Sequence, residues 1–510
     1  MSCQLQYLRY CLRQRIRKAL DELPDTLDET YDRTLEEIGK QNWEYAHRLF
    51  QCVAAASRPL RVEELAEFLA FDFDTDSTPT LREDWREEDP AHAVRSMCSS
   101  LLAIADVDGS SIIQFAHFSV KEYLTSKRLA ESKGTISRFH VSMTLAHTMM
   151  AQVCLGVLLH IDEGITKDDL ERFPLARYAA EHWVSHAQFQ DELPNIQDGM
   201  KHLFEPKKHH LSVWVWIYDP ELRTGASSFE CPSSARATPL HYAASCGLHD
   251  IVKFLILERS QNIHALDFMF NETPLSMASR RGHSKVARVL LEHGADTNIR
   301  NKTHCSPLDL ASENGHVEVV RVLLENNANV NFCDQDKWTA LHLASISGEV
   351  AVARVLLKNG ADANAKQIDG QTPLYWSIND GVAQVLLEYR ADPNARDGGN
   401  QTPLHGVMKY GRAGAARVLL ENGVDANARD AKNRTPLHVA SEEGLLHGVR
   451  LLLQYGADIH ARDDKGQTPF QVASASASGF PGKHKDVMQL LLESGAEDHH
   501  QENGRVLPES

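Results

Sequence analysis

Residues 435–458, TPLHVASEEGLLHGVRLLLQYGAD, contain His438, Ser441, Glu442 and Asp458, the side-chain types of a serine hydrolase. That chemistry needs a nucleophile on a strained turn, typically GxSxG, and a His and a carboxylate that converge on it. No GxSxG occurs in the chain, and Ser, His and Asp recur in other segments at a regular spacing. We therefore interpret these side chains as parts of a scaffold and expect no enzymatic activity.

Two histidine patterns raise the question of a metal site. His182 and His186 lie four residues apart in HWVSH, but this segment lacks the internal Glu of HExxH and no third ligand is evident. Four further histidines each follow a TPL or TAL element: His241, His342, His405 and His438. One His per unit of about 33 residues gives no convergent ligand set. We expect neither a metal nor a cofactor.

A phosphate-binding loop is also absent, because no GxxxxGK[ST] occurs. Gly39-Lys40 has Thr34 where the leading Gly should be, and Gly482-Lys483 has Ala477. Such a loop is needed to surround phosphates with backbone N–H groups. We expect that this chain alone does not hydrolyse ATP.

The most regular feature of the chain is a TPL-like element that recurs eight times. Its middle residues are separated by 35, 33, 33, 33, 30, 33 and 33 positions, which predicts a repeat array. The eight elements are Thr238-Pro239-Leu240, Thr273-Pro274-Leu275, Ser306-Pro307-Leu308, Thr339-Ala340-Leu341, Thr372-Pro373-Leu374, Thr402-Pro403-Leu404, Thr435-Pro436-Leu437 and Thr468-Pro469-Phe470.

Each copy predicts a pair of short helices. Thr or Ser caps the first helix, and Pro suits its first position because no backbone N–H is needed there. A glycine is expected to end this first helix at Gly247, Gly282, Gly315, Gly348, Gly381, Gly411 and Gly444. In the second helix of the copy at 435, Val449, Leu452 and Leu453 are expected to face inward. Helices this short are unstable alone, so neighbouring copies must bury each other's apolar faces.

Between copies, a hairpin tip with positive φ is expected two residues before the Thr or Ser. Gly and Asn tolerate that conformation. They occupy five of the seven junctions, at Asn271, Gly370, Asn400, Asn433 and Gly466. His304 and Lys337 depart from the pattern.

TPLHxA, the glycine that ends the first helix and the LLExGAD ending together resemble ankyrin repeats over residues 238–498. The resemblance implies an L-shaped stack whose hairpin fingers and inner helices form a concave protein-binding face without catalytic residues. It also implies that the TPLH histidines hydrogen-bond neighbouring backbone. The fifth copy lacks three residues, which predicts a kink or weak joint. The last copy carries a flexible insertion with Gly479, Pro481 and Gly482 as helix breakers.

Candidate partner-binding residues lie on the predicted fingers. Trp338 is the clearest, since its equivalents in other copies are Gln371, Gln401, Arg434 and Gln467 and large aromatics dominate interface energetics. The alternative is that Trp338 only covers its own hairpin. The complete candidate set is Arg300, Lys302, Trp338, Gln371, Gln401, Arg434 and Gln467.

The first 230 residues lack the repeat. WEYAHRLFQCVAAASR and RVEELAEFLA predict helices separated at Pro59, and SSLLAIADVDGSSIIQFAH predicts two strands around an Asp108-Gly109 turn. A helix, FSVKEYLTSKRLA, follows, so the segment has the elements of a winged helix. The 18 residues from Thr144 contain polar side chains and predict a buried helix, not a membrane span.

LPDTLDETYDRTLEEI, RPLRVEELAEFLA, FAHFSVKEYL and PLARYAAEHWVSHA resemble the segment between the NTPase domain and the repeats of fungal STAND (NACHT-type) proteins. The resemblance implies that an NTPase switch would precede the winged helix and that the repeats sense or bind partners. It also makes His117 a candidate contact for nucleotide phosphate, supplied by another chain. The alternative is a buried His117 that caps the following helix.

Composition favours a soluble, intracellular protein. The net charge is −17, with 25 Lys+Arg against 37 Asp+Glu in residues 1–230 and 28 against 33 in the rest. We expect a protein partner and no nucleic acid, membrane or small-molecule substrate. The five basic residues from Arg9 to Lys18 are expected to form the solvated face of a helix, and the alternative is an arm that binds nucleic acid or a membrane. The acidic residues from Asp72 to Asp89 predict a mobile loop. Nine cysteines without CxxC pairing favour a reducing compartment, cytoplasmic or nuclear.

The fold class is therefore mainly α: a helical segment and a winged-helix-like module followed by an ankyrin-repeat α-solenoid. The expected domains are 1–40, a helical segment; 41–132, the winged-helix-like module; 133–232, a helical linker; 233–498, eight repeats; and 499–510, a disordered tail. Two functions from different classes stay open. The chain is either a protein-interaction scaffold or the regulatory part of an NTPase switch.

Overall fold

The structure is a computed structural model of the chain, and it divides into two compact units. The first unit is Met1–Tyr242 with Leu257–Ser260, and the second is Ala243–Ile256 with Gln261–Ser510. The structure describes residues 26–73, 78–86, 89, 92, 94, 101–107, 109–132, 134–189, 196–222, 224–225, 231, 235–477 and 481–496. The basic run from Arg9 to Lys18, Gly479 and the tail 499–510 lie outside these residues.

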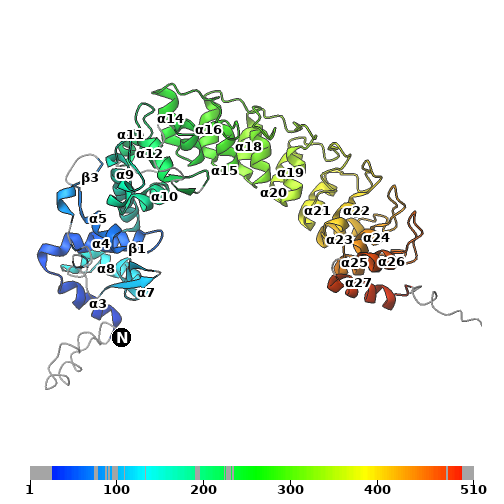
Figure 1. The fold of residues 1–510 in the computed structure, drawn as a ribbon, viewed down its shortest axis with the longest axis horizontal. Coiled ribbons are helices and arrows are strands. Elements are labelled where there is room, and N and C mark those ends of the chain that lie inside the picture. The colour runs from blue at the N-terminus through cyan, green and yellow to red at the C-terminus, as the bar shows by residue number, and fades with distance from the viewer. Residues whose placement is uncertain are drawn as a thin grey trace, which may run out of the picture. The chain divides into compact units, whose positions relative to one another are not determined.

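The first unit begins with the elements of the predicted winged helix (Figure 1). A three-stranded sheet has the order β1-β5-β4, and β4 pairs with β5 antiparallel from Leu102↔Phe115 to Val107↔Ser110. The predicted helices on either side of Pro59 and the predicted strand pair are confirmed, whereas the helix after the strands is divided in two. The elements are α3 (Leu27–Glu36), α4 (Trp43–Ala55), β1 (Leu60–Arg61), α5 (Val62–Leu69), β4 (Leu102–Val107), β5 (Ser110–Phe115), α7 (Phe118–Leu124) and α8 (Lys127–Ala130).

The described part of the acidic stretch is ordered, so the predicted mobile loop is wrong there. Strand β2 (Phe71–Asp72) pairs antiparallel with β3 (Thr80–Leu81), and a 3-10 turn follows at Glu83–Trp85. Asp72 is buried and accepts hydrogen bonds from Arg82, with Nη2 to Oδ2 at 3.1 Å. Pairing with a cation offsets the cost of burying this carboxylate.

Residues 143–217 form a packed helical body rather than a linker. Its helices are α9 (Met143–His160), α10 (Ala176–Ala187), α11 (Gln197–Leu203) and α12 (His210–Ile217). Trp183, Phe204 and Trp214 are fully buried and meet edge to face, with centroid distances of 5.3 Å between the two tryptophans and 5.7 Å from Phe204 to Trp214. Helix α9 is long and apolar enough to cross a membrane, but it packs against α4, α10, α11 and α12 as the central helix of this body.

Contacts from the winged helix join it to this body within the first unit. The backbone N–H of Leu175 donates to Oε2 of the buried Glu67 at 2.7 Å, and that of Ser57 donates to Tyr178 Oη at 3.1 Å. Gly156 of α9 approaches so closely that a Cβ there would lie 2.6 Å from Pro79 O. The predicted modules 41–132 and 133–232 therefore share one core.

The second unit is the repeat array, whose helix pairs follow one another along the chain, with the connecting fingers along one edge (Figure 1). The first helices of the copies are α13 (Pro239–Ser245), α15 (Pro274–Arg281), α17 (Pro307–Glu313), α19 (Ala340–Ser347), α22 (Pro403–Lys409), α24 (Pro436–Glu442) and α26 (Pro469–Ser476). The second helices are α14 (His249–Leu257), α16 (Ser284–Glu292), α18 (Val317–Glu325), α20 (Val350–Lys358), α21 (Asp380–Glu388), α23 (Ala413–Glu421), α25 (Leu446–Gln454) and α27 (Pro481–Glu493). The fold class predicted from the sequence is confirmed.

Left-handed glycines end the first helices at six of the seven predicted positions. Gly282 and Gly348 have φ of 83° and 82° at the ends of α15 and α19. Gly381 is the exception, because it lies in the first turn of α21 and ends no helix. The predicted breakers Pro481 and Gly482 also start α27 instead of interrupting it, since proline needs no N–H at the first helical position.

The inward face of α25 differs by one residue from the prediction. Val449, Leu451 and Leu452 are buried, while Leu453 is only half-buried. Helix α25 packs on three others, α24 of its own copy and α23 and α27 of the neighbouring copies, so its apolar face is wider than a single stripe. Leu452 has no exposed surface.

The fifth copy has no first helix. Residues 372–377 form successive turns in which Tyr375 N, Trp376 N and Ser377 N donate to carbonyls three residues earlier. Three residues shorter than its neighbours, this copy cannot complete the helix before α21 begins. The next copy compensates with Gly406, where a Cβ would lie 2.7 Å from the Tyr375 ring.

All seven finger tips have positive φ, including the two that carry neither Gly nor Asn. His304 and Lys337 have φ of 61° and 62°, close to the 59° of Asn400. The array imposes the left-handed tip on whatever residue is present, at a cost of about 1–2 kcal/mol for a residue with a Cβ.

Replacing Lys337 with glycine is expected to stabilise the array by about 0.5–1 kcal/mol, because glycine adopts this φ without the Cβ penalty. Urea titration of the full chain measures the change. Asp336→Gly is the matched control, since Asp336 is the adjacent exposed residue and is not among the positive-φ residues. A stabilisation by Asp336→Gly equal to that by Lys337→Gly would contradict strain at the tip.

Candidate partner-binding surface

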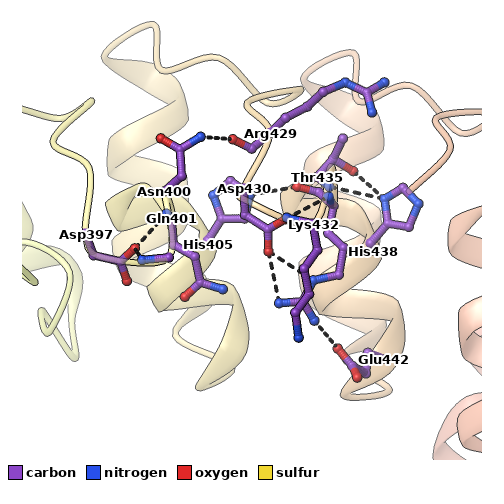
Figure 2. Close-up of polar contacts among 12 residues, drawn as sticks. Asp397, Asn400, Gln401, His405, Arg429, Asp430, Lys432, Thr435, His438 and Glu442 are labelled. Carbon is purple, nitrogen blue, oxygen red and sulfur yellow. Dashed lines mark hydrogen bonds and ion pairs between the residues drawn. The ribbon is translucent and has the colours of Figure 1, made fainter. Parts of the chain in front are cut away.

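In three copies, a histidine connects two neighbouring copies through its two ring nitrogens. In the fourth copy, the N–H of Thr339 donates to His342 Nδ1 at 3.3 Å, and His342 Nε2 lies 3.2 Å from the carbonyl oxygen of Gln371 in the next copy. Since Nδ1 accepts, Nε2 carries the proton and donates. His405 and His438 repeat the arrangement with Arg434 O at 3.1 Å and Gln467 O at 3.0 Å. Figure 2 shows the bonds between Thr435 and His438. The implied hydrogen bonding of these histidines to backbone is confirmed.

Burial of these histidines predicts a loss of stability in mild acid. Burial lowers the pKa of His342 to about 4, while the unfolded chain has the usual value near ~6.5. The unfolded state then binds more protons than the folded state between these values, so the stabilising contribution is full above pH ~6.5 and is lost as the pH falls toward 4. Between pH 7 and pH 5, wild type is expected to lose about 1–2 kcal/mol more than His342→Gln.

Urea titrations at the two pH values measure this difference. Glutamine is the appropriate replacement because Gln471 already occupies the equivalent position of the last copy, where its Oε1 accepts from Thr468 N at 3.0 Å. Equal pH dependence of the two proteins would show that protonation of His342 does not contribute.

Three further copies use a different side chain in place of the histidine to bond the N-cap residue of the first helix, and the fifth copy does not. Ser276, Asp309 and Gln471 all interact with the cap residue three positions earlier, through the hydroxyls in the case of Thr273 and Ser276. In the fifth copy, Tyr375 replaces the histidine and donates instead to Gln401 Oε1 at 3.0 Å. Thr372 Oγ1 is buried there without a hydrogen-bond partner, so the predicted Thr cap is wrong for this copy.

A carboxylate at the base of five of the seven fingers holds the finger's backbone. Asp430 Oδ1 accepts from Lys432 N and Arg434 N, both at 2.8 Å (Figure 2). Burial acts to raise the pKa of Asp430, but these N–H groups and the Arg434 guanidinium hold it below its usual value. Asp397 and Asp463 make the equivalent bonds in their fingers. The finger conformation is therefore fixed by the finger itself.

Adjacent fingers are also joined. Asn400 Nδ2 and Arg396 Nη1 both donate to Arg429 O, at 3.2 and 2.8 Å, and Arg429 Nη1 donates in turn to Arg462 O at 2.8 Å. Figure 2 shows the link between Asn400 and Arg429. A series of side chains thus ties each finger to the next and keeps the row of fingers in register.

Two predicted partner-binding residues belong to this internal bonding. Arg300 Nη2 donates to Cys333 O at 2.5 Å, and its guanidinium lies 4.0 Å from the centroid of Phe332. Lys302 is exposed, but its Nζ donates to Phe268 O and Met269 O at 3.0 and 2.6 Å. Both cations bridge neighbouring fingers, a role that the sequence did not reveal.

The four residues equivalent to Trp338 are all half-buried. Gln371 Oε1 accepts from Gln367 Nε2 at 2.9 Å, and Gln401 accepts from Tyr375 as described above. Arg434 bridges Asp430 and Glu442, at 2.9 and 3.0 Å. The side chain of Gln467 has no such bond among the described residues. Three of these predicted contact residues are therefore held by the array, and their use by a partner stays a prediction.

Trp338 belongs to a row of aromatic rings that crosses three copies. Its ring centroid lies 5.1 Å from that of Trp376, which lies 5.4 Å from that of Tyr410 in a stacked geometry. Trp338 and Trp376 are half-buried, and Tyr410 is 44% exposed. Sequence analysis singled out Trp338 but missed its two neighbours, because Trp376 follows the deletion and Tyr410 follows a helix end.

A second apolar surface was also missed. Leu266, Phe268 and Phe270, on the finger between the first two copies, are 50%, 81% and 41% exposed. The sequence signal was the run of apolar residues at alternate positions in LDFMF.

The remaining candidates lie in the first unit. His117 is the N-cap of α7, where Nδ1 accepts from Ser119 N at 3.3 Å, which confirms the capping interpretation. His117 is exposed and not buried.

His186 pairs with His147 at 2.8 Å and with Tyr178 at 2.9 Å, and its burial lowers its pKa to about 3. Within the described ranges, no three His, Cys, Asp or Glu side chains are grouped to hold a metal ion.

These features define an α-solenoid of stacked helix pairs preceded by a winged-helix domain. Residues 240–334, 326–397 and 404–502 match the family described as Ankyrin repeats (3 copies), which together make up half of the chain. The chain belongs to the ankyrin-repeat family. Residues 31–137 match the family described as GPI inositol-deacylase, winged helix domain, which confirms the predicted module.

Two curated proteins are similar to parts of the chain. "Azaphilone pigments biosynthesis cluster protein L" of Monascus ruber is 30% identical over 294 residues, which is 54% of this chain and 61% of that protein. "Palmitoyltransferase Hip14" of Drosophila melanogaster is 37% identical over 75 residues, 15% of this chain and 12% of that protein. The chain thus spans less than two thirds of either relative.

Proposed function

We propose that this chain is a protein-interaction scaffold that binds a protein partner along the fingers and first helices of its ankyrin array, on the concave face expected for such an array. Ankyrin repeats suggest protein–protein interaction in general. The observation that carries the proposal is the uniform geometry of the fingers. Seven tips share a left-handed backbone, and side chains of the array fix them.

A row of fixed fingers favours binding for a physical reason. Ordering a flexible loop on association costs free energy, and a surface that is already ordered avoids this cost. The side chains at the tips differ between copies, including Asn271, His304, Lys337 and Gly370. The backbone is therefore constant while the contact surface varies, as a specific binding surface requires.

A test uses the full chain to isolate a partner from an extract of its own organism and then measures amide hydrogen exchange of the complex. The proposal expects slower exchange in the fingers and first helices between residues 262 and 476. Protection confined to α9–α12, or a partner retained after the array is unfolded by urea, would contradict it.

The second candidate is the regulatory and sensing part of a STAND NTPase switch. The observation that favours it is the winged-helix domain before the repeats, which is the order that the STAND resemblance implies. His117 at the start of α7 would then contact a nucleotide bound by an NTPase domain. Sequencing the 5′ end of the transcript separates the candidates, since an in-frame GxxxxGK[ST] segment upstream of Met1 would favour the switch.

Neither candidate requires catalysis by this chain. Because no phosphate-binding loop is present in the sequence, the purified chain is expected to release no phosphate from ATP above the rate of a buffer control. A malachite-green assay measures the release. Turnover that follows the protein through gel filtration would overturn the proposal that the chain is not an enzyme.

A further inference from the structure

The aromatic row of Trp338, Trp376 and Tyr410 depends on the irregular fifth copy. In that copy, residues 372–377 form turns where other copies have a helix, and Trp376 lies between the rings of the fourth and sixth copies. Gly406 makes room for Tyr375, whereas the equivalent residues of other copies are larger, among them Tyr242, Met277 and Val439. The fifth and sixth copies are thus complementary where Gly406 meets Tyr375, and the position of the aromatic row follows from this packing.

Two cations lie at one end of the row without an acidic partner. The Arg412 guanidinium carbon lies 4.8 Å from the Tyr410 centroid and 5.8 Å from that of Trp376, while Lys409 Nζ lies 5.6 Å from the Tyr410 centroid. Among the described residues, neither cation is in an ion pair. The Glu442–Arg434 and Glu272–Arg280 pairs show that acidic partners are supplied elsewhere on this surface.

Arg412 is fixed in place. Its Nη1 donates to Trp376 O at 2.6 Å, so it connects the sixth copy to the turn of the fifth. Burial lowers the pKa of Arg412, and the nearby groups that oppose this effect are the tyrosines Tyr410 and Tyr375, not carboxylates. A half-buried guanidinium without a counter-ion favours binding of an anion. The guanidinium has already lost part of its hydration on folding, and an ion pair with the anion would offset that cost.

The geometry of the row favours an extended segment. The two centroid steps of 5.1 and 5.4 Å give the row a span of at most about three residues of extended chain at ~3.3 Å each. Aromatic surfaces bind proline-rich and aromatic segments, because the rings offer large apolar area at low entropic cost. The neighbouring cations add a requirement for negative charge beside Tyr410.

We propose that Trp338, Trp376 and Tyr410, together with Lys409 and Arg412, bind an extended acidic segment of a protein partner that carries an aromatic or proline side chain. The apolar side chain lies on the two tryptophans, and the carboxylate lies at Lys409 and Arg412. The inference rests on the proposed scaffold function and names the chemistry of the partner. Single-stranded nucleic acid is disfavoured, since the chain carries a net charge of −17 and the rings of Trp376 and Tyr410 stack on each other.

The test selects displayed random 12-residue peptides on the full chain and measures the affinity of the enriched peptides by fluorescence anisotropy. Enrichment of peptides with Asp or Glu near Trp, Phe or Pro is expected. Lys409→Glu should weaken these peptides at least tenfold, and raised salt should also weaken them. Lys358→Glu makes the same charge change at an exposed residue of α20, on a second helix, and should change affinity less than twofold.

Lys409 is suited to this test because it is exposed and is in no ion pair within the described part of the chain, so the variant is expected to fold. Trp338→Ala provides a second variant, with thermal unfolding followed by circular dichroism as the check on folding. It should weaken the same peptides at least tenfold while the array stays folded.

Four outcomes would overturn the inference: no enriched peptide, enriched peptides without acidic residues, affinity unaffected by Lys409→Glu, or micromolar binding of oligo(U) in place of peptide. If a partner protects fingers outside residues 338–412 from hydrogen exchange, the scaffold proposal stands and this inference fails. If no part of the array is protected by any partner, both fail.

Discussion

Replacing Leu452 with alanine is expected to lower the free energy of unfolding by about 2–5 kcal/mol, because the smaller side chain leaves a cavity in a well-packed interface. Leu452 is fully buried in α25, which packs on helices of the copies before and after it. A cavity there weakens the nearest-neighbour contacts that provide most of the stability of a repeat array. Urea titration of the full chain, followed by circular dichroism, measures the loss.

Leu453→Ala is the matched control in the same turn of the same helix. Leu453 is half-buried, so its truncation removes less contact area and should cost less than about 1 kcal/mol. A loss below about 1 kcal/mol for Leu452→Ala, or equal losses for the two variants, would contradict the packing described for this helix.

The sequence predicted the array because its signals are local and repeated. Thr or Ser followed by Pro starts a helix, and the glycine several residues later ends it. Eight copies of one pattern leave little doubt about spacing even where one copy is irregular. The backbone hydrogen bonds of the TPLH histidines were implied by the resemblance to ankyrin repeats, and the structure has such bonds, as between His405 and Arg434 O.

The sequence could not predict features that depend on contacts between copies. His304 and Lys337 have left-handed backbones because the array fixes the finger, which overrides their own preference for negative φ. Arg300 and Lys302 were assigned to a partner, yet they donate to carbonyl groups of adjacent fingers. A polar side chain on a predicted surface does not show whether its hydrogen bonds are internal.

The fifth copy shows that a deletion within a repeat array can be more informative than the regular repeat pattern. The missing residues predicted a weak joint, and the structure has turns in place of a helix there. The same change brings Trp376 beside Trp338 and Tyr410, which are 38 residues or fewer away in sequence but belong to different copies. Such a row can be recognised only once the stacking of the copies is known.

Replacing Trp214 with alanine is expected to have the largest effect in the first unit, a loss of more than about 3 kcal/mol. Trp214 is fully buried against Trp183 and Phe204, and its Nε1 donates to Ala180 O at 2.9 Å. The variant therefore creates a large cavity and also removes the indole hydrogen bond to a carbonyl oxygen of α10, which adds about 0.5–1.5 kcal/mol. Urea titration and limited proteolysis of residues 143–217 measure the loss.

Trp214→Phe separates the two contributions, because it keeps an aromatic ring but removes the N–H donor. It should lose less stability than Trp214→Ala. Trp85→Ala controls for loss of an indole as such, since Trp85 is 47% exposed and its removal should cost less than about 1 kcal/mol. If residues 133–232 were only a connecting segment, Trp214→Ala would be as mild as Trp85→Ala. A large difference between these two variants is what a shared core of α9, α10 and α12 requires.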